Sequence, residues 1–264
     1  MLQCCPNGAR PADAYPAVPV SPRHLAWDAR AVSALGVLSV HVHPRDMDGR
    51  ESLDPGTVGA VTSAIRKAAP RTEIGVTTAR WVEPDPGTRI DIIGQWGRLP
   101  TQARPDVASV NVHERGWQRV CAALNAVGIG VELGVWTSGD AVQLKQAGLP
   151  PGTVRVVAEV TVTEPDVAVA EAERILSALG PTSAPILLHG EEAGAWPVLE
   201  YAQRIHLDTR IGFEDTLERP DRHRRAVSNE ELVRYALRKS VALQCAERSA
   251  SRPARRPRGG GHQR

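Results

Sequence analysis

Eight short apolar runs recur along this chain, and a helical pattern separates most of them. Such alternation of strands and helices is typical of a parallel sheet covered by helices. Eight repeats within about 215 residues match a (β/α)8 barrel, also called a TIM barrel, in both order and size. The runs that we interpret as strands are residues 2–5, 37–43, 74–77, 107–112, 129–135, 154–162, 185–190 and 209–215.

Two of the expected helices have clear starts. Ser21-Pro22 and Asp54-Pro55 each place a capping residue before a proline, as in the first turn of a helix. Apolar spacing predicts the helical segments 22–35, 55–69, 90–93, 120–127, 141–147, 166–179 and 196–205. A doubly wound open sheet is the main alternative, but it requires a glycine-rich turn after the first strand, and Asn7-Gly8-Ala9-Arg10-Pro11 is not one. We therefore predict an α/β fold, with a single barrel domain over residues 1–240.

The last residues differ in composition from the barrel. The formal net charge of the chain is +2, but residues 249–264 contain five arginines and no acid, so residues 1–248 carry −3. This segment is rich in Arg, Pro and Gly and has nothing apolar to bury, which predicts a disordered tail. A solvated terminus is the default interpretation, and we predict no nucleic-acid partner.

The remaining composition indicates an ordinary globular protein. No apolar run approaches the ~20 residues of a membrane span, and the first residues lack the basic and apolar regions of a secretory signal. These features predict a cytoplasmic protein with no membrane partner. The four cysteines, Cys4, Cys5, Cys121 and Cys245, show no Cys-x-x-Cys spacing, so we expect neither a disulfide framework nor a cysteine–zinc site.

The segment His41-Val42-His43-Pro44-Arg45-Asp46 ends the second apolar run. Residues two apart on a strand share a face, so His41 and His43 are expected to point the same way. Two imidazoles on one face at the end of a strand are good precursors of a metal site. The alternative is that each histidine simply bonds to neighbouring backbone.

In a barrel of this kind the active site lies at the C-terminal ends of the strands. On the eighth run, Arg210, Gly212 and Glu214 are expected to share one face, and this strand neighbours the first, with the second next to it. Glu214 is therefore predicted to reach a cation held by the two histidines. Two imidazoles and one carboxylate suit a catalytic zinc, and they also suit Fe(II). Other polar residues expected at strand ends are Asn7, Thr77, Thr78, Asn111, His113, Glu114, Glu132, Glu159, His189 and Glu191.

Several of these motifs, taken together, resemble the β-keto acid cleavage enzymes (3-keto-5-aminohexanoate cleavage enzyme-like proteins). The motifs are Asn7-Gly8-Ala9-Arg10, His41-Val42-His43-Pro44-Arg45-Asp46, Gly75-Val76-Thr77-Thr78, Val131-Glu132 and Arg210-Ile211-Gly212-Phe213-Glu214-Asp215. The resemblance covers residues 2–240 in order and with compatible spacing. It implies a zinc-dependent (β/α)8 barrel that condenses a β-keto acid with acetyl-CoA, giving acetoacetate and a new acyl-CoA. The resemblance further implies that this barrel assembles into a homo-oligomer.

The resemblance also implies roles for single residues. His41, His43 and Glu214 look like the ligands of one zinc ion per chain. Asp215, paired with Arg210, looks like the base that removes a proton next to the keto group. The further site residues it implies are Glu132 as a second acid–base or substrate contact, and Thr77, Thr78 and Arg10 as substrate contacts.

The sequence departs from the family at some of these positions. Arg10 stands where some members have a glutamate that contacts a substrate amine, which argues against an amino-bearing substrate and for an anionic or neutral one. The turn Thr78-Ala79-Arg80 replaces a more glycine-rich one. We expect His113 and Glu114 in a solvated loop, and Asp46 bonded to Arg45 or to loop backbone. The tryptophans are expected to anchor the core or an interface.

Two other functions stay open on the sequence alone. One is a different metal-dependent barrel enzyme, such as an aldolase or hydrolase of a keto or hydroxy acid, which would not depend on acetyl-CoA. The other is a catalytically inactive barrel that binds a small acid. The presence of Arg210, Glu214 and Asp215 argues against the inactive barrel.

Overall fold

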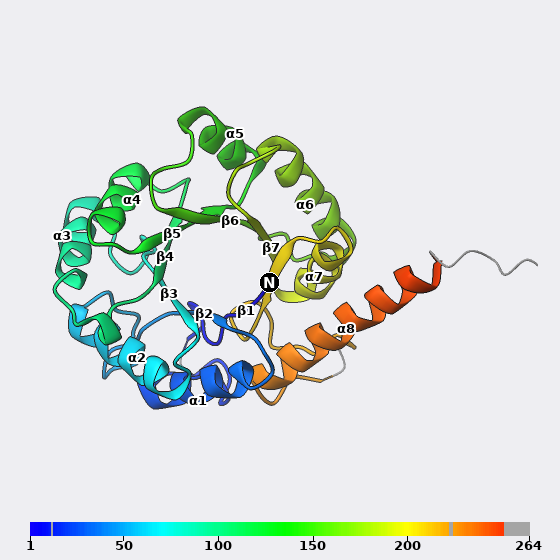
Figure 1. Ribbon diagram of the computed structural model, residues 1–264, viewed down its shortest axis with the longest axis horizontal. Helices are drawn as coiled ribbons and strands as arrows, with labels where there is room; N and C mark the ends of the chain where they lie inside the picture. The colour runs from blue at the N-terminus through cyan, green and yellow to red at the C-terminus, as the bar shows by residue number, and fades with distance from the viewer. Residues whose placement is uncertain (12, 222–223, 251–264) are drawn as a thin grey trace, which may run out of the picture.

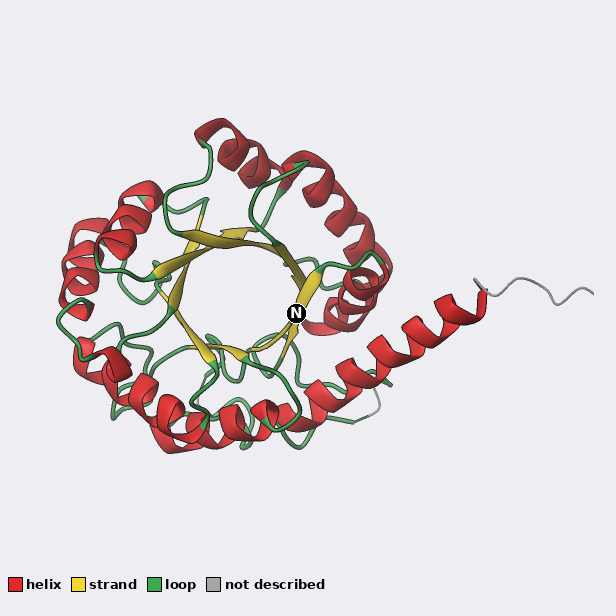
Figure 2. Cartoon of the chain, viewed as in Figure 1, coloured by secondary structure: helices red, strands yellow, loops and turns green. Residues whose placement is uncertain are grey.

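A computed structural model describes residues 1–11, 13–221 and 224–250 of the chain. In this part, eight parallel strands close into a barrel in the order of the sequence, and a ring of helices surrounds them (Figures 1 and 2). The strands are Leu2–Cys4 (β1), Ser39–Val42 (β2), Glu73–Thr77 (β3), Val107–Asn111 (β4), Gly130–Val135 (β5), Thr153–Val160 (β6), Ile186–Gly190 (β7) and Asp208–Ile211 (β8). The helices are Pro22–Ser33 (α1), Pro55–Ala68 (α2), Pro86–Trp96 (α3), Trp117–Ala126 (α4), Ser138–Ala147 (α5), Pro165–Leu179 (α6), Ala195–Arg204 (α7) and Asn229–Ala250 (α8), with short 3-10 turns at Thr101–Ala103 and Glu192–Gly194.

The closed barrel confirms the predicted fold class and excludes the open sheet. The expected helix starts are also present, because the Ser21 hydroxyl accepts a hydrogen bond from the His24 N–H and an Asp54 carboxylate oxygen accepts one from the Thr57 N–H. Each of these side chains satisfies a backbone donor that the first turn leaves free. The helix α8 has no counterpart in the sequence analysis.

One prediction about strand β8 is wrong. The strand ends at Ile211, and the Asp215 and Thr216 N–H groups both donate to the Gly212 carbonyl oxygen, at 2.9 and 3.0 Å. A Cβ atom on Gly212 would lie 2.1 Å from the Cys5 carbonyl oxygen, so only glycine fits where the chain passes Cys5, just after β1. Glu214 consequently lies in a turn, and it does not share a strand face with Arg210.

The N-terminus of α8 is tied to three separate segments by Asn229. The buried Asn229 amide accepts from the Phe213 N–H at 2.7 Å and donates to the Pro6 carbonyl oxygen at 3.0 Å. The same amide donates to the Asp28 carboxylate on α1 at 2.7 Å. Asn229 therefore fixes the turn that carries Glu214 against the end of β1.

The Asp28→Asn variant is expected to change the pH dependence of stability. Burial raises the pKa of Asp28 to about 6, although the Asn229 amide opposes the shift. A raised pKa means that the folded state holds this proton more tightly than the unfolded state, so the stabilisation is complete below pH 4 and disappears as pH rises through 6. Relative to Asp28→Asn, the wild-type free energy of unfolding should fall by up to about 3 kcal/mol between pH 4 and 7, as measured by urea titration. A constant difference across this range would contradict the shift.

Further predictions from the sequence concern membrane-spanning helices, the cysteines, the C-terminal tail and the domain boundary. None of the helices in the described residues is long and apolar enough to span a membrane. Cys4, Cys5 and Cys121 are buried and free. The predicted disordered tail falls, from residue 251 onward, outside the described residues, and α8 extends past the expected domain boundary at residue 240.

Candidate metal centre and active site

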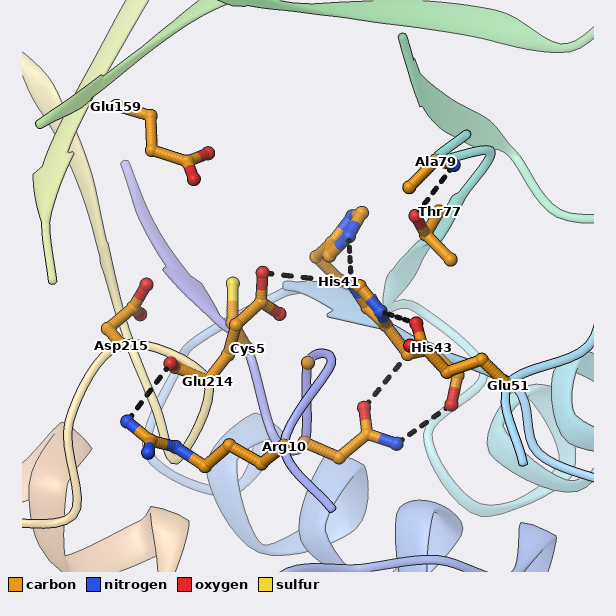
Figure 3. A network of polar contacts seen from close by, with 12 residues as sticks. Cys5, Arg10, His41, His43, Glu51, Thr77, Ala79, Glu159, Glu214 and Asp215 are labelled. Carbon is orange, nitrogen blue, oxygen red and sulfur yellow. Dashed lines mark hydrogen bonds and ion pairs between the residues drawn. The ribbon is translucent and has the colours of Figure 1, made fainter. Parts of the chain in front are cut away.

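Three potential metal ligands meet at the C-terminal end of β2 (Figure 3). His41 lies on β2 and His43 directly follows it, and their Nε2 atoms are 3.3 Å apart with the rings nearly perpendicular. Glu214 Oε1 lies 3.7 Å from His43 Nε2. One ligand atom from each residue lies within 4.8 Å of the others, so the three side chains can hold a metal ion.

The outward nitrogen of each histidine faces a carboxylate. His43 Nδ1 lies 2.5 Å from Glu51 Oε1, and His41 Nδ1 lies 3.5 Å from Glu132 Oε2. A carboxylate at Nδ1 fixes the ring orientation and leaves Nε2 available as the ligand atom. Asn7 adds a further constraint, because its amide exchanges two hydrogen bonds with the His43 backbone.

Glu132 belongs to a buried network inside the barrel. Its Oε1 accepts hydrogen bonds from Gln3 at 2.9 Å and from Arg155 at 2.7 Å. Burial alone would raise the pKa of Glu132, but His41, Arg155 and Gln3 together lower it to about 2. The ionised carboxylate is placed to orient the His41 ring. The second acid–base or substrate contact expected for Glu132 stays a prediction.

Glu214 has one satisfied oxygen and one free oxygen. Arg210 Nη2 donates to Oε1 at 2.8 Å, whereas Oε2 is buried with no hydrogen-bond partner. Burial raises the pKa of Glu214, but Arg210 and the two histidines outweigh it and lower the value to about 2. Gly8, with φ of +56°, packs against this side chain so closely that a Cβ there would lie 2.3 Å from Glu214 Cγ. The Asn7-Gly8 turn therefore shapes the space for Glu214.

Asp215 lies next to the metal-ligand group but is fully buried. Arg210 Nε donates to Asp215 Oδ1 at 3.0 Å, and His189 Nδ1 lies 3.2 Å from the same oxygen. The other oxygen, Oδ2, has no hydrogen-bond partner. Asp215 is thus a carboxylate that Arg210 and His189 both contact through one oxygen only.

A cavity of about 540 Å³ opens beside these residues at the C-terminal ends of the strands. Its wall includes Trp81 and Trp136 on one side and Glu159 and Glu191 on another. The expected site residues that line it are Arg10, His41, His43, Thr77, Glu132, Arg210 and Glu214. Thr78 and Asp215 are not part of its lining.

The model of one protein family, the β-keto acid cleavage enzymes, matches residues 1–254. The chain belongs to this family. No curated protein matches the sequence. Among solved structures, a binary complex of ObcA with oxaloacetate aligns with a TM-score of 0.66 at 16% identity, over 87% of this chain and 64% of that one.

Two further solved structures have similar barrels. A ternary complex of ObcA with a C4-CoA adduct and oxalate aligns with a TM-score of 0.62 at 17% identity, over 87% of this chain and 65% of that one. The 3-dehydroquinate dehydratase of Geobacillus kaustophilus HTA426 gives 0.61 at 10% identity, over 95% and 92% of the two chains. At these sequence identities the similarity supports the fold alone. The chain spans less than two thirds of the length of the ObcA chains.

The two expected threonine contacts of this family member differ in position. Thr77 lines the cavity and its hydroxyl accepts from the Ala79 N–H at 3.1 Å. Thr78 instead donates its hydroxyl to the Ser109 carbonyl oxygen at 2.6 Å. Thr77 therefore belongs to the cavity wall, whereas Thr78 holds neighbouring backbone outside it.

Arg10 is already engaged in an ion pair. Its Nη2 lies 2.6 Å from Glu192 Oε1, and its Nε donates to the Phe213 carbonyl oxygen. Glu192 neutralises the cation at the cavity wall, so Arg10 attracts an anionic substrate less than its sequence position suggests.

Two expectations about loop carboxylates have opposite outcomes. Asp46 is bonded to loop backbone as expected, accepting from the Asp48 and Arg50 N–H groups at 2.9 Å. The expectation that Glu114 is solvated is wrong, because it is buried in an ion pair with Arg89. This pair holds the loops after β3 and β4 together, since Glu114 also accepts from the Arg80 N–H.

The tryptophans divide between the core and the site. Trp96, Trp117 and Trp196 are buried, as expected for core anchors. Trp81 and Trp136 instead line the cavity, and their ring centroids lie 6.4 Å apart. These two rings give the cavity an aromatic wall.

Proposed function

We propose that this protein is a zinc-dependent enzyme that condenses a β-keto acid with acetyl-CoA and cleaves the product to acetoacetate and a new acyl-CoA. One observation carries the proposal: the His41, His43 and Glu214 donors converge beside an Asp215 carboxylate held by Arg210, at a cavity in a barrel of the β-keto acid cleavage enzyme family.

The residues present fit a zinc ion. Glu214 Oε2 is a buried polar atom without a partner, and both histidines direct Nε2 inward while a carboxylate faces Nδ1. Two imidazoles and a carboxylate are a common catalytic zinc set that leaves a position open, although Fe(II) accepts the same donors. When bound, the ion would supply Lewis-acid polarisation of the substrate keto oxygen.

The protein's own residues would perform the proton transfer. Asp215 Oδ2, the oxygen without a partner, is the atom we assign to accept the proton from the carbon between the keto and carboxylate groups. Arg210 donates to the opposite oxygen and thereby orients the carboxylate. Asp215 is fully buried and is not part of the cavity lining, so this step requires the cavity wall to move and admit the substrate carbon. The Thr77 hydroxyl would contact the bound acid.

The proposed route is a Claisen condensation followed by a retro-Claisen cleavage. The substrate carbanion attacks the thioester carbonyl of acetyl-CoA, and CoA leaves as its thiolate. The thiolate then attacks the keto carbon that came from the β-keto acid. The bond between this carbon and the neighbouring α-carbon breaks, which gives the new thioester and the carbanion of acetoacetate. That carbanion takes back the proton from Asp215, so the base is regenerated.

The ObcA complexes support this substrate class. Oxaloacetate, bound in one of them, carries a keto group β to one of its carboxylates, and another complex contains a C4-CoA adduct. The cavity of about 540 Å³ lies in the size range of small-molecule sites. We further propose that the chain is a cytoplasmic homo-oligomer, in which Trp27, 69% exposed on α1, contributes to a subunit contact.

The proposed function is tested by incubating the purified enzyme with a panel of β-keto acids, acetyl-CoA and zinc. We expect equal amounts of acetoacetate and a new CoA thioester from at least one acid, detected by mass spectrometry. Equal consumption of the keto acid without acetyl-CoA would indicate an aldolase or hydrolase instead. Binding of acids without any product would indicate an inactive barrel.

The Glu51→Ala variant is expected to bind zinc about 10–100-fold more weakly than the wild type, because His43 loses the carboxylate that orients its ring. Competition with a chromogenic chelator measures the affinity. Asp48→Ala is a matched control, since Asp48 is an exposed carboxylate in the same loop. Equal zinc affinity in Glu51→Ala and wild type would show that Glu51 does not support the ligand.

A further inference from the structure

His189, at the C-terminal end of β7, is buried between two carboxylates. Its Nδ1 lies 3.2 Å from Asp215 Oδ1, and its Nε2 lies 3.3 Å from Glu159 Oε2. Figure 3 shows the two flanking carboxylates, with that of Glu159 directed toward the centre of the site. The side chain of His189 is 1% exposed, so these contacts are shielded from solvent.

The barrel itself builds this arrangement. Glu159 on β6 and His189 on β7 are direct register partners in the parallel sheet. Asp215 reaches the other side of the ring from the turn after β8. Three neighbouring strands therefore supply the two carboxylates and the imidazole between them.

Each ring nitrogen lies within ion-pair distance of a carboxylate, although neither contact has hydrogen-bond geometry. A carboxylate on each side of a buried ring favours its doubly protonated, charged form. The titratable and charged groups around the ring are Glu159 from β6, Glu191 after β7, and Arg210 and Asp215 from β8 and its turn. Burial and Arg210 lower the pKa of His189, but Asp215 and Glu159 outweigh them and raise it to about 9. Geometry and charge thus both favour an imidazolium ion.

Arg210 does not position Asp215 alone, because its guanidinium group also binds Glu214. Its Nη2 donates to Glu214 Oε1 at 2.8 Å and lies 3.0 Å from Asp215 Oδ1. The His189 contact is to the same Asp215 oxygen, so both cations hold Oδ1 and leave Oδ2 without a partner. His189 is the second cation that fixes which oxygen stays free.

We propose that His189 is a positioning residue of the reaction: as an imidazolium ion oriented by Glu159, it holds Asp215 by one oxygen and presents the other to the substrate. This inference depends on the proposed role of Asp215 as the base. Glu191 lies beside this cluster, and burial together with the neighbouring Glu159 raises the pKa of Glu191 to about 8.

The first test does not require activity. Nitrogen-15 NMR of the enzyme with labelled histidine reports the protonation of each ring, and the His189 signals are assigned by their loss in His189→Gln. We expect both His189 nitrogens to be protonated at neutral pH in the wild type and the ring to become neutral in Glu159→Gln. A neutral His189 ring in the wild type would overturn the proposal.

The second test separates positioning from folding. His189→Gln should lower kcat about 10–100-fold with KM within about twofold of wild type, because binding is kept while the base is misplaced. In the Asp215→Asn background the same substitution should have no further effect on kcat, since it acts through Asp215. His24→Gln is the control, because His24 is exposed on the outer helix α1; its kcat should match wild type.

The outcomes also distinguish this inference from the proposed function. Unchanged kcat in His189→Gln, or an equal loss in both backgrounds, would overturn the positioning role while the wild-type activity stands. If the wild type forms no CoA thioester with any β-keto acid, the proposed function fails. The NMR measurement then still decides whether His189 is doubly protonated between Glu159 and Asp215.

Discussion

The His41→Ala variant is expected to be isolated without its metal ion, whereas the wild type should hold close to one divalent ion per chain. His41 is one of three donors, and its loss leaves His43 and Glu214, too few for a stable site. Turnover should fall by at least about 1000-fold, because the Lewis acid contributes several kcal/mol to transition-state stabilisation. Elemental analysis of the purified proteins measures the ion, and the β-keto acid assay measures the rate.

The His41→Ala fold is expected to persist, which makes the metal measurement interpretable. Glu132, which faces His41, keeps its hydrogen bonds to Gln3 and Arg155 and is not left as an unpaired buried charge. Circular dichroism should therefore match wild type. His24→Ala, on the outer helix α1, is the control and should retain the ion. A wild-type protein that is folded, fully active and free of metal would end the zinc proposal.

The sequence was sufficient to predict the barrel because its evidence is local and repeated. Each apolar run and each cap, such as Ser21 and Asp54, identifies its own element without reference to distant residues. The end of β8 was missed for the opposite reason. Gly212 packs directly on the Cys5 backbone, which is remote in sequence, and no pattern within residues 209–215 reports that contact or the turn that follows it.

The same distinction applies to the site. His41 and His43 are recognisable because they are two residues apart at the end of one strand, and Glu214 because it belongs to a family motif. Their supporting residues come from unrelated positions: Glu51 returns to His43 through a loop, and Arg155 reaches Glu132 from the next strand. These contacts depend on three-dimensional packing. The fully buried position of Asp215, likewise, follows from the turn after β8 and from His189 on a separate strand.

The Asp215→Asn variant is expected to keep its metal ion and lose turnover by about 10²–10⁴-fold, the range that a general base contributes. Asparagine has the size of aspartate, and its oxygen can still accept the hydrogen bond from Arg210. Glu214 supplies the metal ligand from its own side chain, so the ion should remain. Exchange of the substrate α-proton with deuterated water, followed by NMR, measures proton removal apart from the later steps, and it should fall in parallel with kcat.

A paired variant shows whether the two adjacent carboxylates have separate roles. Glu214→Gln should lose both the ion and the activity, whereas Asp215→Asn should lose only the activity, because only Glu214 faces the histidines. If Asp215→Asn exchanges the proton and turns over like wild type, the base is another residue. Glu159 would then be the next to test, since its carboxylate lines the cavity and lies on the other side of His189.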